Sequence, residues 1–147
     1  MECPGEIMER LNGLDWLASA VLILDRDGKV VYINPAAEDL LEYSSKVLLS
    51  QSLKQIFANS DELERICSQV RHRDPAEKRQ ELTLERVGRS PLHVHCIFKA
   101  IDFPAEAVLM ELRENIQQLR QERENRLVDQ NQANKELVRN LAHEIKN

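Results

Sequence analysis

The segment from Glu114 to Asn147 places the strongest constraint on the fold of this chain. All four glycines and all five prolines lie before it. Because these residues punctuate turns, a long stretch without them favours one uninterrupted element. About 34 residues at a rise of 1.5 Å each would form a helix roughly 50 Å long. We therefore expect a long C-terminal helix that follows a separately folded region.

Apolar residues are sparse on this expected helix and recur in two phases, the first at Leu112, Ile116 and Leu119 and the second at Leu127, Val138, Leu141 and Ile145. Asn131 and Asn134 occupy seam positions in the second phase, and the step from Arg123 to Leu127 resembles a stutter. A seam this polar does not stabilise a lone helix. Asparagine in a seam fixes register at a cost in stability. We expect a weak two-chain coiled coil, able to hold two registers of similar energy as a signalling element requires.

Short apolar runs separated by turn residues predict an α+β domain before this helix. The predicted strands cover residues 20–24, 30–33, 81–85, 92–100 and 107–112. Three predicted helices begin at Pro35 with Asn34 as cap, at Ser52, and after a cap at Ser60. The order β-β-α-α-α-β-β-β with short connections predicts a five-stranded antiparallel sheet covered by helices on one face.

Ahead of this domain, the chain shows helical periodicity, with apolar residues at Ile7, Met8, Leu11, Leu14 and Leu17. Capping of the following domain and pairing with a second copy are equally good accounts of such an amphipathic helix. The predicted organisation is an N-terminal helix over residues 1–18, a sensor-like domain over 19–113, and a signalling helix over 114–147.

Composition argues against several classes of protein. A formal charge of −5 disfavours a nucleic-acid binder, which would carry a basic stripe. The three cysteines are scattered without CxxC spacing, which indicates reduced thiols in a cytoplasmic protein. No apolar run reaches the ~18 residues that a membrane span needs, and no signal peptide opens the chain. We expect a cytoplasmic protein that binds neither nucleic acid nor membrane.

The strongest chemical signal is His143 with Glu144 beside it and Asn147 one turn further along the same helix. A zinc site of the H-E-x-x-H type would need a second histidine where Asn147 stands, so that interpretation is weak. Phosphotransfer fits better, because a neutral imidazole is a nucleophile near pH 7 and Glu144 can accept its hydrogen bond. The plain alternative is a solvated histidine on a charged helix.

Several segments resemble a known family. NLAHEIKN, at the end of the chain, resembles the H-box of sensor histidine kinases, in which H-E-x-x-N marks kinases that also act as phosphatases. The strand and helix order resembles a PAS domain. NPAAEDLL from Asn34 to Leu41, SL..IF from Ser52 to Phe57, GRS from Gly88 to Ser90, and ELVRNLAHEIKN are similar to nitrogen-regulation sensor kinases of the NtrB type.

This resemblance implies His143 as phosphoacceptor, Glu144 as an aid to the kinase reaction, and Asn147 as the residue that positions water for dephosphorylation. It further implies a homodimer, a PII-type signal protein as input, a response regulator with a receiver Asp as output, and ATP with Mg for the full-length protein. The second phosphoacceptor helix and the ATP-binding domain have no counterpart here. We therefore expect a piece of a longer protein that does not phosphorylate itself.

No cofactor is expected in this part of the protein. His72 lies just past the apolar face of its helix, where we expect it to be exposed rather than to ligate haem. His93 and His95 share the strand face opposite Leu92 and Val94 and could share a metal, but two solvent-facing histidines are the preferred account. The competing function is a non-catalytic PAS dimerisation adaptor with a coiled-coil tail, in which the HEIKN run is coincidental.

Overall fold

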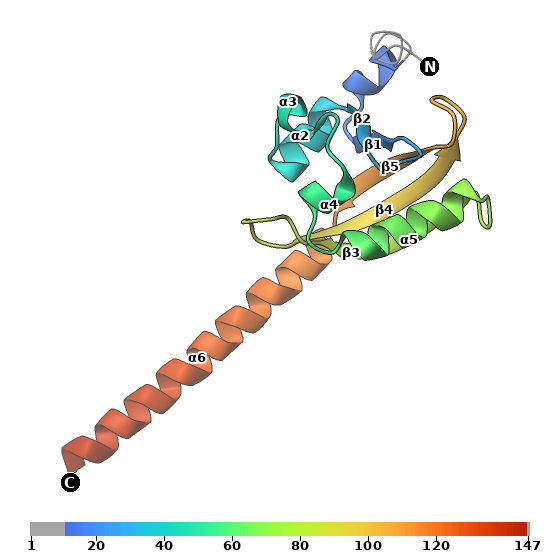
Figure 1. Ribbon diagram of the computed structural model, residues 1–147. Helices are drawn as coiled ribbons and strands as arrows, with labels where there is room; N and C mark the ends of the chain where they lie inside the picture. The colour runs from blue at the N-terminus through green and yellow to red at the C-terminus, as the bar shows by residue number, and fades with distance from the viewer. Residues whose placement is uncertain (1–10, 147) are drawn as a thin grey trace. The chain divides into compact units, whose positions relative to one another are not determined.

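The computed structural model describes residues 11–146 (Figure 1). The chain divides after Glu114 into two compact units. The first unit holds a five-stranded sheet with short helices, and the second is one long helix. Residues 1–10 of the expected N-terminal helix, and Asn147, lie outside the described residues.

The sheet confirms the predicted α+β fold. Its strands are β1 (Ala20–Leu24), β2 (Val30–Ile33), β3 (Glu77–Leu84), β4 (Leu92–Ile101) and β5 (Ala107–Glu114), in the order β2-β1-β5-β4-β3. Every neighbouring pair is antiparallel. β3 begins at Glu77 rather than at the predicted Glu81, because the polar run before Glu81 pairs with the second half of β4. Tertiary pairing here overrides a segment without apolar alternation.

The helices of the first unit are α2 (Pro35–Leu41), α3 (Ser45–Leu48), α4 (Leu53–Ile56) and α5 (Ser60–Arg71). α3 is a single turn capped by Ser44, too short to show a helical period in the sequence. Ser60 was predicted as the cap of α5, but it is the first helical residue and Asn59 precedes it. The side chain of Asn59 instead binds the edge of β3, donating to the Thr83 carbonyl at 2.6 Å and accepting from the Glu85 amide at 3.1 Å.

One face of the sheet packs against these helices and forms the main core. α5 runs across this face (Figure 1) and contributes the predicted apolar set of Leu63, Ile66, Cys67 and Val70, all buried. From β4, alternate residues point into the same core, again as predicted, at Leu92, Val94, Cys96 and Phe98. Strand alternation and helical period therefore meet in one apolar layer.

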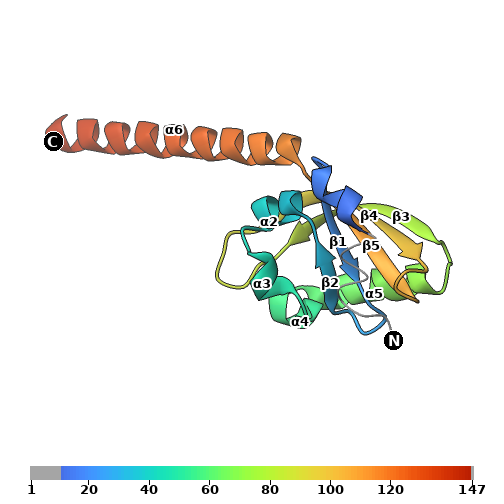
Figure 2. The same cartoon turned by 90° about the horizontal axis from the view of Figure 1, so that it is seen from above.

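The opposite face of the sheet carries a smaller apolar cluster over β1, β2 and the start of β5, formed by Val21, Ile23, Tyr32 and Ala107. Leu11 and Leu14 pack against it from the segment that precedes β1. In this segment residues Asn12–Trp16 form a short 3-10 helix, η1, seen ahead of β1 in Figure 2. The Tyr32 hydroxyl donates to Asp15 Oδ1 at 2.5 Å, and burial together with that carboxylate raises the pKa of Tyr32.

Asn34 joins four parts of this unit through one buried side chain. Its Oδ1 accepts from the amide of Ala37, which caps α2, and from the amide of Val21 in β1, both at 2.9 Å. Its Nδ2 donates to the carbonyls of Leu14 at 3.1 Å and Ser19 at 2.8 Å. The residue is 0% exposed, so water cannot replace any of these bonds.

We expect Asn34→Ala to lower the free energy of unfolding by about 3 kcal/mol. The substitution removes the cap of α2, and it leaves the buried backbone amide of Val21 without its acceptor. Urea denaturation followed by circular dichroism measures this change. Ser44→Ala, which removes the exposed cap of α3, is the matched control and should cost less than about 1 kcal/mol. Equal costs for the two variants would contradict the central role given to Asn34.

Candidate functional site

The predicted chemical residues lie on α6 (Ile116–Lys146), the single helix of the second unit. His143 and Glu144 are both exposed near its end. Among the described residues neither side chain has a hydrogen-bond or ion-pair partner, and Asn147 lies outside those residues. α6 therefore presents an unhindered imidazole next to a carboxylate, on a backbone that fixes their relative direction.

The apolar side chains of α6 are exposed in the single chain. Leu127, Val138, Leu141 and Ile145 are between 50% and 86% exposed. Together with Asn131 and Asn134 they follow alternating steps of four and three residues, which is the a/d spacing of a coiled-coil seam. In that heptad His143 comes two residues after the d position of Leu141, on the side of α6 that faces away from the seam. A partner helix on the seam would leave His143 accessible, a point that sequence reasoning about the H-box alone did not reach.

The other histidines are placed as solvent-facing or strand-face residues. His72 is exposed at the C-cap of α5. His93 Nδ1 lies 2.9 Å from Thr83 Oγ1, whereas His95 Nδ1 lies 3.4 Å from Glu81 Oε1, so the two strand histidines have separate partners on β3. Within the described part of the chain, no group of three or more His, Cys, Asp or Glu side chains could hold a metal ion.

The two described cysteines are buried in the core of the first unit. Burial raises the pKa of Cys67 to about 11, opposed in part by Arg71. Burial also raises the pKa of Cys96, and the neighbouring Cys67 adds to this effect. Since the thiolate is the reactive form, these cysteines act as core side chains rather than nucleophiles.

Arg86 anchors a polar cluster that the sequence pattern did not reveal. Its guanidinium, 5% exposed, donates to the carbonyls of Leu41 at 3.0 Å and Ser90 at 2.9 Å, and to Glu42 at 3.3 Å. Arg89 also binds Glu42, at 3.2 Å, and lies over the ring of Tyr43. Arg86 therefore ties the end of α2 to the turn between β3 and β4. An arginine in the polar segment 85–90 gives no sign of burial in sequence, because its partners are mostly backbone carbonyls.

None of the helices that the structure describes has the length and apolar character needed to cross a membrane. Among the described residues, the exposed pair His143 and Glu144 lies on α6. The buried polar side chains Asn34 and Arg86 of the first unit instead make hydrogen bonds that stabilise its fold.

Comparison with solved structures places the first unit among PAS domains. The PAS domain of nitrogen regulation protein NR(II) from Vibrio parahaemolyticus aligns with a TM-score of 0.57 and 26% identity, covering 78% of this chain and 99% of that one. A PAS domain from a two-component sensor histidine kinase aligns with a TM-score of 0.59 at 18% identity, over 75% of this chain and 96% of that chain, and supports the fold alone.

Curated relatives carry the similarity into sequence. The sensory histidine kinase/phosphatase NtrB of Vibrio alginolyticus is 35% identical over 135 residues, which are 91% of this chain and 38% of that protein. NtrB of Escherichia coli O157:H7 is 31% identical over 134 residues, with the same coverage. The chain thus spans little more than a third of the length of these relatives.

A family model described as a PAS domain matches residues 18–116, from the residue pair before β1 to the start of α6. This range contains the whole five-stranded sheet and the helices α2 to α5. The predicted similarity to NtrB-type sensor kinases is confirmed by these comparisons, and the chain belongs to the PAS domain family.

Proposed function

We propose that this chain is the sensory and dimerisation part of a cytoplasmic two-component sensor histidine kinase/phosphatase that controls a nitrogen-response regulator, with His143 as phosphoacceptor. The observation that carries the proposal is the exposed His143–Glu144 pair on α6, following a PAS-family domain. The 35% identity to NtrB over 91% of the chain supports it.

In the proposed reaction one ring nitrogen of His143 attacks the γ-phosphorus of ATP. A nitrogen–phosphorus bond forms, the bond from the γ-phosphorus to the bridging oxygen breaks, and ADP leaves. Glu144 accepts the hydrogen bond of the other ring nitrogen and stabilises the positive charge that develops on the imidazole. ATP and Mg would be held by a separate ATP-binding domain, as the family resemblance implies, and no cofactor is proposed for the PAS unit.

Dephosphorylation is the proposed task of Asn147. Its carboxamide, four residues beyond His143, would position the water that attacks the phosphorus atom of the phosphoryl group to be removed. The proposed output partner is a response regulator whose receiver Asp takes the phosphoryl group from His143, and the proposed input partner is a PII-type signal protein. Both partners are proposed from the family resemblance.

Homodimerisation is proposed through α6. Burying the exposed seam of one helix against a second copy removes apolar surface from water at four positions, Leu127, Val138, Leu141 and Ile145. Asn131 and Asn134 fall between them and, in a parallel pair, would each face the same residue of the partner. These amides keep the pair in register but weaken it, which leaves the helix responsive to the PAS unit.

The double substitution Asn131→Leu and Asn134→Leu should tighten self-association of the chain by at least about tenfold, because two polar seam layers become apolar. Sedimentation equilibrium measures the dissociation constant. Asn125→Leu with Asn140→Leu is the matched control, since these exposed asparagines lie off the seam. Equal tightening by both pairs would rule out the proposed seam.

Incubation with a separate histidine-kinase catalytic domain and ATP should label the chain with acid-labile, base-stable phosphate, and His143→Gln should abolish the label because the nucleophile is gone. His72→Gln, which alters another exposed histidine, should leave it intact. Label that survives His143→Gln would refute the assignment. If the chain stays unlabelled while a known phosphoacceptor helix is labelled in the same assay, the adaptor function is correct instead.

Glu144→Gln should slow phosphorylation of His143 by about 100-fold, the usual contribution of a positioned acid–base group. The initial rate of label incorporation under the same conditions provides the measurement. Glu136→Gln, an exposed change two turns earlier on α6, is the control and should keep the wild-type rate. A Glu144→Gln rate equal to that of the control would remove Glu144 from the mechanism.

A further inference from the structure

Arg139 is a cationic residue of α6 that the reaction proposed above does not use. It lies four residues before His143, so the two residues occupy neighbouring turns on one side of the helix. Both side chains are exposed. Within the described part of the chain, no hydrogen bond or ion pair holds the guanidinium of Arg139. An uncommitted cation therefore lies one turn from the exposed imidazole.

Helix geometry directs the ring of His143 towards Arg139. Side chains on a helix lean towards its N-terminus, so each covers the turn that precedes its own Cα. The turn that precedes His143 contains Arg139, and residues four apart have Cβ atoms only about 5–6 Å from each other. A phosphoryl group on the distal ring nitrogen would extend in the same direction. The long side chain of Arg139 is able to reach it.

Arg139 and Asn147 lie on opposite sides of His143. Because four residues make slightly more than one turn, Arg139 is rotated about 40° to one side of His143 and Asn147 about 40° to the other. Arg139 directly follows the seam residue Val138, at a heptad position off the seam. A partner helix on the seam would therefore leave Arg139 accessible. A guanidinium on this side would also not displace the water that Asn147 is proposed to position.

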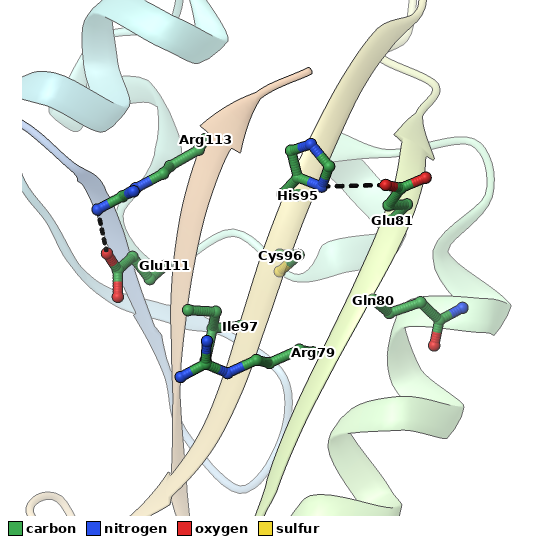
Figure 3. A pocket seen from close by; sticks show the side chains of 8 residues that line it. All are labelled: Arg79, Gln80, Glu81, His95, Cys96, Ile97, Glu111 and Arg113. Carbon is green, nitrogen blue, oxygen red and sulfur yellow. Dashed lines mark ion pairs between the residues drawn. The ribbon is translucent and has the colours of Figure 1, made fainter. Parts of the chain in front are cut away.

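The strand histidine His95 lacks such a cation. Its Nδ1 lies 3.4 Å from Glu81 Oε1, and the side chain of Arg113 on the adjacent strand points away from it (Figure 3). A carboxylate this close would repel a phosphoryl group, since both are anions. The surroundings of His143 differ because Arg139 can balance the charge that a phosphoryl group brings.

We propose that Arg139 binds the phosphoryl group once His143 carries it, through charge-assisted hydrogen bonds from the guanidinium to the phosphoryl oxygens. This assignment rests on the proposed function, in which His143 is the phosphoacceptor. The planar guanidinium matches a phosphoryl group in charge and in its paired hydrogen-bond geometry. Arg139 thus stabilises the phosphorylated state and takes no part in forming the nitrogen–phosphorus bond.

Binding by Arg139 prolongs the lifetime of the phosphorylated histidine. The phosphoryl group is lost to water most readily when the other ring nitrogen is protonated, because imidazole then leaves as a neutral molecule. A guanidinium on the phosphoryl oxygens disfavours that proton and lowers the pKa of the phosphorylated ring, whereas the carboxylate of Glu144 raises it. Two further charged residues, Glu136 and Lys146, lie within two turns of His143 on α6 and are the same in every variant below.

Chemical phosphorylation by phosphoramidate allows a test that needs neither ATP nor a kinase. A ring nitrogen of His143 attacks phosphorus, the nitrogen–phosphorus bond to the ring forms, and the bond to the amino group of phosphoramidate breaks. Ammonia leaves, and the ring proton passes to solvent. In the phosphorus NMR spectrum, the signal of His143 is the one that is absent from His143→Gln. Its titration with pH gives the pKa of the phosphorylated ring.

Arg139→Gln should raise this pKa by about 0.5, the effect of one unit charge about 5 Å away in water. Above the pKa, the phosphoryl group should be lost about threefold faster, because the protonated fraction increases by that factor. Arg139→Lys keeps the charge and should retain most of the wild-type pKa. Arg126→Gln, which removes another exposed cation several turns earlier on α6, is the matched control and should change neither quantity.

Three outcomes would overturn the proposal. The first is an equal pKa in Arg139→Gln and the wild-type chain. The second is an equal rise in Arg126→Gln, which would reflect the net charge of the chain. The third is an equal rise in Arg139→Lys, which would reflect the shape of the side chain instead of its charge. An unchanged pKa would leave His143 as phosphoacceptor, whereas absence of ATP-dependent label on His143 would refute the proposed function and leave the pKa comparison intact.

Discussion

The PAS unit depends on the buried carboxamide of Asn34. Its oxygen serves the first turn of α2 and the first strand at once, and its nitrogen holds the backbone at Leu14 and Ser19. A carboxylate could not make the two donations, and a shorter hydroxyl could not span the four groups. The segment over the second face of the sheet, the strand and the helix are therefore positioned by one side chain.

Local signals in the sequence decide which parts of this fold could be predicted. Asn34 followed by Pro35 predicts the start of a helix, and the alternation in residues 92–100 predicts a strand with one buried face. The structure confirms both, as α2 and β4. Local signals of this kind carry their own period or cap. Glu77 to Gln80 carries none, and becomes strand only because β4 offers it unpaired backbone groups. The buried state of Arg86 was equally out of reach, since its main partners, the carbonyls of Leu41 and Ser90, are set by tertiary folding.

The proposed phosphoacceptor was readable from sequence for a different reason. His143 needs no tertiary structure to acquire its neighbours, because a helix alone places Glu144 beside it and Leu141 on another side. The heptad gives the direction of His143 relative to the seam. This direction holds because α6 is one continuous helix, so that the seam residues and His143 share the same helical phase. The proposed partner helix and the proposed ATP-binding domain belong to other surfaces. Sequence therefore yields the proposed nucleophile and its orientation on the helix, but not its surroundings.

The proposed contact between two copies of α6 is weak, and this weakness suits a sensor. Two layers of the α6 seam are formed by asparagine, at Asn131 and Asn134, in place of apolar residues. A ligand or partner can shift a two-state equilibrium only by its differential affinity for the two states, typically about 1–3 kcal/mol. An apolar seam would place the alternative register beyond that range. Contacts worth about this much leave the pair stable enough to form and close enough in energy to be rearranged by a signal.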